Sequence, residues 1–107
     1  MLKKYDPKFS KGSLFICTKC GKDFSKSDSE RAEDLKKDLR SELKEFDAHK
    51  KIRVMVSGCL GVCIKDEQAF AYYPNDGREG NAEVYTTTSD YKESKQDILD
   101  FIKSKVT

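Results

Sequence analysis

Residues 52–63 read IRVMVSGCLGVC, and this stretch governs how the rest of the chain is expected to fold. Ile52, Val54 and Val56 occupy every second position, which is the period at which a half-buried β-strand points its side chains to one face. The predicted strand runs directly into a glycine and then into a loop that holds two cysteines with three residues between them.

A second pair of cysteines follows a strand-like stretch nearer the N-terminus. Residues 14–20 read LFICTKC, so a short apolar run ends at Cys17, and Cys20 follows after two intervening residues. In the stretch quoted first, the pair is Cys59 and Cys63. Each pair therefore comes immediately after a predicted strand.

An amphipathic helix is predicted between the two strands, over about residues 28–49. Ser27 has Glu30 three residues later, which is the spacing of a capping box, and Ser29 is an alternative cap. Apolar residues recur at steps of three and four and form one stripe along this helix: Ala32, Leu35, Leu39, Leu43 and Phe46. We expect the stripe to pack on the sheet.

The order strand, helix, strand favours a right-handed crossover that joins two parallel neighbouring strands. Parallel strands end at the same edge of a sheet. We therefore expect Cys17, Cys20, Cys59 and Cys63 to meet at one edge, near the start of the first helix.

The C-terminal half of the chain predicts a hairpin followed by a second helix. Residues 69–73 and 82–87 are strand-like, and turn-forming residues lie between them. Residues 90–105 have the pattern of an amphipathic helix that Ser89 or Asp90 can cap, and Glu93 follows Asp90 at capping-box spacing. The predicted order is then β-α-β-β-β-α, an α/β fold in which two helices pack on a mixed sheet.

The composition fits one folded domain, because the chain has 107 residues, of which 36% are hydrophobic and 37% charged. We expect a flexible lead-in over residues 1–12 and a single domain over 13–107. The net charge of +2 divides into +5 over residues 1–26, zero over 27–63 and −3 over 64–107. The basic part can steer an acidic partner or can simply be solvated. It lacks the interleaved aromatic residues that favour nucleic-acid binding.

The cysteines are expected to be reduced. No apolar stretch has the length of a membrane-spanning helix, and residues 1–12 lack the apolar segment of a signal peptide. The expected location is therefore the cytoplasm, without a membrane partner. Thiols stay reduced there, which favours metal binding or redox chemistry over structural disulfides.

Four thiols in two tight pairs fit three kinds of chemistry, besides the plain alternative that they are small buried side chains. A [2Fe–2S] cluster takes four thiolates, with one pair on each iron, and a structural zinc takes four in a tetrahedron. Dithiol exchange at Cys17 and Cys20 is the third kind. Enzymes that perform it place the cysteine motif at a helix N-terminus and beside a cis-proline, and the sequence indicates neither feature. Gly58 and Gly61 allow tight turns that aim N–H groups at sulfur.

The sequence SGCLGVC at residues 57–63, after an Ile-Val strand, resembles the second cysteine motif of the thioredoxin-like [2Fe–2S] ferredoxins. Cys17 at the end of the first strand and Tyr73-Pro74 after the second motif are similar to that family as well. The resemblance implies a thioredoxin-like fold and one-electron transfer through a [2Fe–2S] cluster. The close spacing of Cys20 departs from these ferredoxins and is similar to a group of predicted metal-binding relatives.

We therefore predict an electron-transfer or cluster-carrying protein with the ligands Cys17, Cys20, Cys59 and Cys63. The alternatives are a zinc-binding or metal-free module of the same fold that binds a partner, and a thioredoxin-like dithiol oxidoreductase. The expected partner is a redox protein and not a nucleic acid, and a homodimer is also considered. The sequence has no paired carboxylates, phosphate-binding glycine loop or serine–histidine arrangement, which favours a carrier over a catalyst. His49, the single histidine, is expected at the surface near the end of the first helix.

Overall fold

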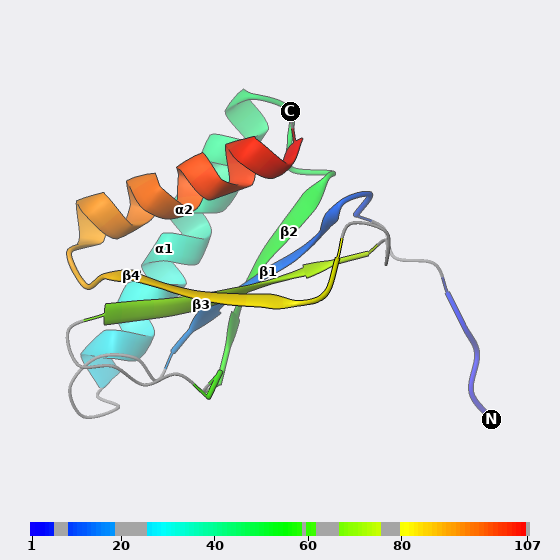
Figure 1. Cartoon of the computed structure of the whole chain (residues 1–107), viewed down its shortest axis with the longest axis horizontal. Helices are drawn as coiled ribbons and strands as arrows, with labels where there is room; N and C mark the ends of the chain where they lie inside the picture. The colour runs from blue at the N-terminus through cyan, green and yellow to red at the C-terminus, as the bar shows by residue number, and fades with distance from the viewer. Residues whose placement is uncertain (6–8, 19–25, 59, 62–66, 76–79, 107) are drawn as a thin grey trace.

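The computed structural model describes residues 1–5, 9–18, 26–58, 60–61, 67–75 and 80–106. Within these ranges the elements in chain order are β1 (Gly12–Cys17), α1 (Lys26–Glu45), β2 (Ile52–Ser57), β3 (Glu67–Pro74), β4 (Glu83–Thr88) and α2 (Tyr91–Val106). The order β-α-β-β-β-α is the predicted one (Figure 1).

The described strands form one mixed sheet in the order β2-β1-β3-β4. β1 and β2 are parallel, whereas β3 pairs antiparallel with both β1 and β4. The register sets Gly12 opposite Ile52 and Cys17 opposite Ser57, so the two parallel strands end together. The predicted α/β class and the predicted parallel pair are therefore confirmed.

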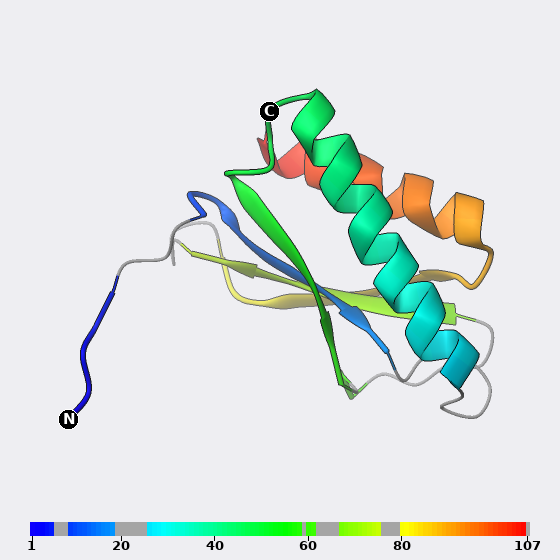
Figure 2. The ribbon, with the colours of Figure 1, turned by 180° about the vertical axis from the view of Figure 1, so that it is seen from behind.

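Both helices lie on the same face of the sheet, as the front and back views show (Figures 1 and 2). The predicted apolar stripe of α1 lies in the core between the layers. Ala32, Leu35 and Leu39 are 0% exposed, Leu43 is 1% exposed, and Phe46 packs against the margin of the core. The stripe positions the helix over the sheet by burying apolar surface.

α1 stops before its predicted end near residues 48–50 because Asp47 adopts a left-handed conformation, with a φ of 60°. The Ala48 N–H donates to the Leu43 carbonyl over 2.8 Å. The Asp47 N–H donates to the Lys44 carbonyl over 3.3 Å, which completes a Schellman motif. Glycine is the usual residue at the left-handed position. Because this chain has an aspartate there, the end of the helix could not be predicted from the sequence.

The starts of the two helices were predicted unequally well. α1 begins before Ser27 and Ser29, so both residues lie inside the helix rather than at its cap. For α2 the Asp90 carboxylate accepts a hydrogen bond from the Glu93 N–H over 3.0 Å. Of the two predicted caps of the second helix, the structure therefore confirms Asp90 rather than Ser89.

A hydrogen bond from the Tyr91 hydroxyl to the Asp38 carboxylate joins the first turn of α2 to α1. Burial raises the pKa of the Tyr91 hydroxyl above its ordinary value, and the bonded carboxylate raises this pKa further. The neutral, protonated form of Tyr91 is thus the form that holds the two helices together.

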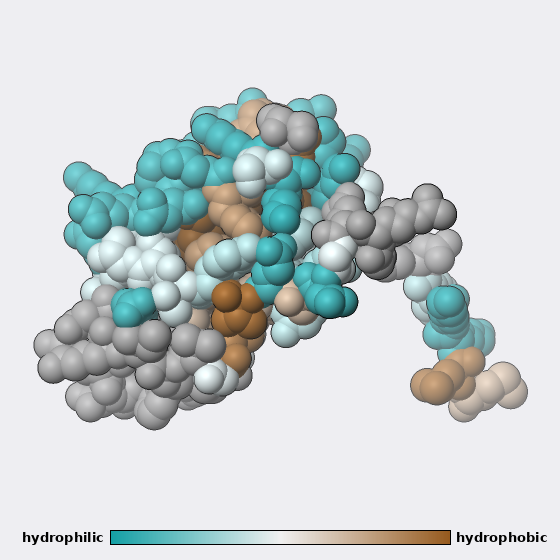
Figure 3. Space-filling view, in the orientation of Figure 1, coloured by the Kyte–Doolittle hydropathy of each residue, from teal (hydrophilic) through white to brown (hydrophobic). Residues whose placement is uncertain are grey.

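The surface is polar over α2 and partly apolar where β3 and β4 are not covered. Hydrophilic side chains cover the outer side of α2, and apolar side chains are visible between α2 and the sheet (Figure 3). Tyr73 and Val84 are large apolar residues of β3 and β4 that remain 44% and 43% exposed. Across the described ranges, no helix combines the length and the apolar character needed to cross a membrane.

We predict that Leu39→Ala lowers the free energy of unfolding by about 2–5 kcal/mol, because truncating a fully buried leucine leaves a cavity in the core. Denaturant unfolding measures the change. Lys37→Ala, on the exposed side of the same helix, is the matched control and should change stability by less than about 0.5 kcal/mol. An unchanged midpoint for Leu39→Ala would show that α1 does not pack on the sheet.

We predict that Tyr91→Phe flattens the loss of stability at alkaline pH. The pKa of Tyr91 is raised above the unfolded value of 10.0, so above that pH the unfolded chain loses a proton that the folded protein keeps. This contribution is complete below the unfolded pKa and is lost as pH rises toward the folded pKa. Unfolding free energies measured from about pH 9 to 12 should therefore fall less steeply in the variant. Tyr5→Phe, in the exposed N-terminal segment, is the control, and parallel curves for wild type and Tyr91→Phe would contradict the prediction.

Candidate metal-thiolate site

Cys17 is the last residue of β1, and its side chain is fully buried. Leu14 and Ile16 belong to the core under the helices, so by alternation Cys17 faces the helix-free side of the sheet. There it packs with Ala69 of β3 and with Leu60. Cys17 therefore lies where the two parallel strands end, as the sequence predicted.

Two hydrogen bonds join the residue after Cys17 to the strand that precedes Cys59. The Thr18 N–H donates to the Ser57 carbonyl over 3.0 Å, and the Thr18 hydroxyl donates to the same carbonyl over 2.6 Å. Thr18 lies between Cys17 and Cys20, and Ser57 lies two residues before Cys59. The segments that carry the two cysteine pairs therefore leave the sheet from one point.

Leu60 provides a second link between the two segments. It lies between Cys59 and Cys63 in the sequence and packs against Cys17. The next residue, Gly61, has a φ of 85°, a conformation that is strained for residues with a side chain. The loop after β2 thus reaches the end of β1, and its turn requires glycine.

The remaining predicted ligands, Cys20, Cys59 and Cys63, lie outside the described residues, so the meeting of all four thiols stays a prediction. Among the residues that the structure does describe, no group of three or more His, Cys, Asp or Glu side chains is placed to hold a metal ion. The donor set itself fits a metal. Two thiols on each of two segments that start together is an arrangement that iron–sulfur and zinc centres use.

Gln68 of β3, which is not among the residues predicted from the sequence, supports the site from the helix side of the sheet. Its side chain is fully buried, and its amide group donates to the carbonyls of Cys17 and Ala69, each over 2.9 Å. The Arg31 guanidinium of α1 donates to the Gln68 side-chain oxygen over 3.1 and 3.3 Å. These bonds connect α1 to the backbone of Cys17. The available signal was a polar residue next to the apolar stretch predicted as the third strand.

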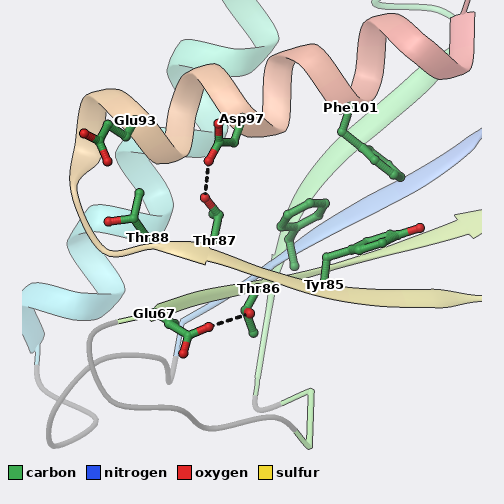
Figure 4. A pocket seen from close by; sticks show the side chains of 9 residues that line it. Glu67, Tyr85, Thr86, Thr87, Thr88, Glu93, Asp97 and Phe101 are labelled. Carbon is green, nitrogen blue, oxygen red and sulfur yellow. Dashed lines mark hydrogen bonds between the residues drawn. The ribbon is translucent and has the colours of Figure 1, made fainter.

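A hollow of about 550 Å³ lies between β4 and α2 (Figure 4). The ring centroid of Phe101 lies 5.4 Å from that of Phe70 and 5.1 Å from that of Tyr85, which gives the hollow an aromatic side. Its other lining residues are hydroxyl and carboxylate side chains: Glu67, Thr86, Thr87, Thr88, Glu93 and Asp97. Two of these hydroxyls already donate to two of the carboxylates, so the polar groups serve to hold β4 against α2 and β3.

Compared with known proteins, the chain matches no family model, no curated protein and no solved structure. The resemblance to thioredoxin-like ferredoxins therefore stays an expectation based on residues 57–63 and Cys17. A function is therefore inferred from the residues of this chain and from their geometry.

We predict that Gln68→Leu destabilises the protein by about 1–3 kcal/mol, because two buried carbonyls lose their shared donor. Chemical denaturation measures the effect. Gln96→Leu, on the exposed side of α2, removes an amide of the same size and should be nearly neutral. Equal stability of Gln68→Leu and wild type would mean that Gln68 does not fix the end of β1.

Proposed function

We propose that this protein carries electrons through a [2Fe–2S] cluster held by Cys17, Cys20, Cys59 and Cys63. The observation that carries the proposal is the parallel pairing of β1 and β2, whose register sets Cys17 opposite Ser57. Because each strand leads into one cysteine pair, the pairing supports a single centre that both pairs share.

The residues around the proposed centre have separate tasks. Such a cluster would supply the transfer of one electron at a time. The chain itself must hold thiolates close together against their mutual repulsion, and the bonds from Thr18 to Ser57 fix where the two segments begin. Cys17 is 0% exposed and forms an apolar cluster with Ala69 and Leu60.

A structural zinc is the alternative centre for the same four thiols. Zinc is most needed where a domain is too small to fold on its own core. Here the helices and the sheet enclose a continuous core of buried side chains from α1, β1, β2, β3 and α2. Since the fold has this support, a redox role for the centre is favoured over a purely structural one.

A thioredoxin-like dithiol oxidoreductase is the third function considered for the cysteines. An attacking thiol needs solvent access, and Cys17 is fully buried. Cys17 ends β1, and in the described part of the chain α1 begins at Lys26. A helix N-terminus that would activate Cys17 is therefore not supplied by α1.

The detailed fold, the location and the partner of the proposed carrier are inferred from the same observations. The element order and the parallel pair support a thioredoxin-like arrangement. Thiolates that hold a metal centre must stay reduced, which favours the cytoplasm. A carrier of single electrons needs a protein redox partner, and we propose one here.

The proposal is tested by purifying the protein without oxygen after expression with iron supplied, and by recording its visible spectrum and metal content. We expect a brown protein with about two irons and two sulfides per chain. Cys59→Ser should bleach the colour or shift the spectrum, because one thiolate ligand is replaced. A colourless protein with about one zinc per chain would assign the alternative centre.

Ser57→Ala is the matched control for Cys59→Ser. It removes a hydroxyl two residues away but keeps the carbonyl that accepts from Thr18, so its spectrum should equal that of the wild type. If the anaerobic wild-type protein binds neither iron nor zinc, the proposal of electron transfer is wrong.

A further inference from the structure

A cavity of about 520 Å³ lies where the end of α1 meets the start of β2, the outer strand of the sheet. Phe9 of the N-terminal segment forms one wall. The Lys11 N–H donates to the Lys51 carbonyl over 2.8 Å, which holds this segment beside the start of β2. The Ser10 N–H adds a bond of 3.3 Å to the Lys50 carbonyl. The volume lies within the range of sites for small molecules.

All charged side chains that line this cavity are basic. Arg40 and Lys44 lie one turn apart on α1, Arg53 lies on β2, and His49 comes from the turn between them. No carboxylate of the described residues is part of the lining. Asp47 approaches His49 Nδ1 only to 4.0 Å, and the Asp47 side chain is 95% exposed to solvent. The cavity is therefore a concentrated positive site.

The three permanently charged groups form no ion pair with a described carboxylate. Arg40 Nε donates to the Val54 carbonyl over 2.8 Å, which uses one of the five N–H donors of a guanidinium. The Arg53 guanidinium carbon lies 5.8 Å from the centroid of the Phe9 ring. Lys44 lines the same cavity, so three like charges share one lining. An anion bound between them would remove this repulsion.

His49 adds a polar group to the same cavity. The sequence predicts this residue at the surface near the end of the first helix, and the structure places it in the turn after α1, with 36% of its side chain exposed. Its Nδ1 is enclosed and has no hydrogen-bond partner among the described groups.

We propose that this cavity binds the phosphate group of a small organic phosphate. A guanidinium binds phosphate through paired N–H···O bonds, and a lysine adds a point charge, so Arg40, Arg53 and Lys44 match this ligand. The ring of Phe9, which lines the cavity, offers apolar surface to the organic part. Ile52, at the start of β2, lines the cavity, whereas the segment that carries Cys59 follows the other end of this strand, so this proposal does not depend on the metal centre.

The test titrates the full-length chain with phenyl phosphate at constant ionic strength, with calorimetry and thermal unfolding as readouts. We expect saturable binding and a rise in Tm. Lys44→Gln and Arg53→Gln should each raise Kd roughly tenfold or more, as expected when a charged hydrogen-bonding partner is lost. Lys92→Gln, which removes an exposed cation of α2, is the control and should leave Kd unchanged.

Folding of the variants is checked separately, because loss of binding has to be distinguished from loss of structure. Removing one of the three like charges that share this lining should leave the Tm without ligand unchanged or raise it. Absence of saturable binding to the wild type would overturn the proposal. So would equal Kd values for the wild type and the Lys44→Gln/Arg53→Gln double variant.

Methyl phosphate tests the organic part of the ligand. Tighter binding of phenyl phosphate than of methyl phosphate, with the difference lost in Phe9→Ala, supports contact between the ligand and the ring. Equal affinity for the two phosphates would overturn this part. Binding of a short single-stranded oligonucleotide without binding of either phosphate would overturn the proposal and assign the basic cavity to a nucleic acid.

Discussion

The parallel pairing of β1 with β2 is the constraint on which the candidate site depends. It places Cys17 opposite Ser57, and the two bonds from Thr18 to the Ser57 carbonyl extend the pairing beyond the last residue of β1. Two segments far apart in the sequence thus begin at one point, and Leu60 packs back on Cys17. A shared thiolate centre then needs only short loops, which lowers the entropic cost of bringing its ligands together.

The same strand has a different environment at each end. Its C-terminal end leads to the second cysteine pair, where the neighbouring described groups are apolar or form hydrogen bonds. Its N-terminal end lies beside α1, where Arg40, Lys44 and Arg53 line one cavity. Gln68 and Arg31 connect α1 to the cysteine end, so α1 contacts both regions. The fold therefore provides two chemically distinct sites, the cysteine end and the basic cavity, at opposite ends of β2.

The fold was largely predictable because its signals are local and periodic. The alternation around Val54 and the stripe around Leu39 each report burial of one face, and the strand–helix–strand order then implies the parallel pair. The end of α1 was not predictable, because Asp47 occupies a position where glycine is usual. Of the site, the placement of Cys17 was predicted. The basic cavity was missed, because its residues come from three separate segments and share no sequence period.

The metal content of two double variants, purified without oxygen, tests most directly whether the two cysteine pairs form one centre. The variants are Cys17→Ala/Cys20→Ser and Cys59→Ser/Cys63→Ser, each confirmed as folded by far-UV circular dichroism. A shared centre predicts that each variant loses all the iron or zinc that the wild type binds, since either pair alone supplies too few thiolates. A full complement of metal in either folded variant would contradict the account.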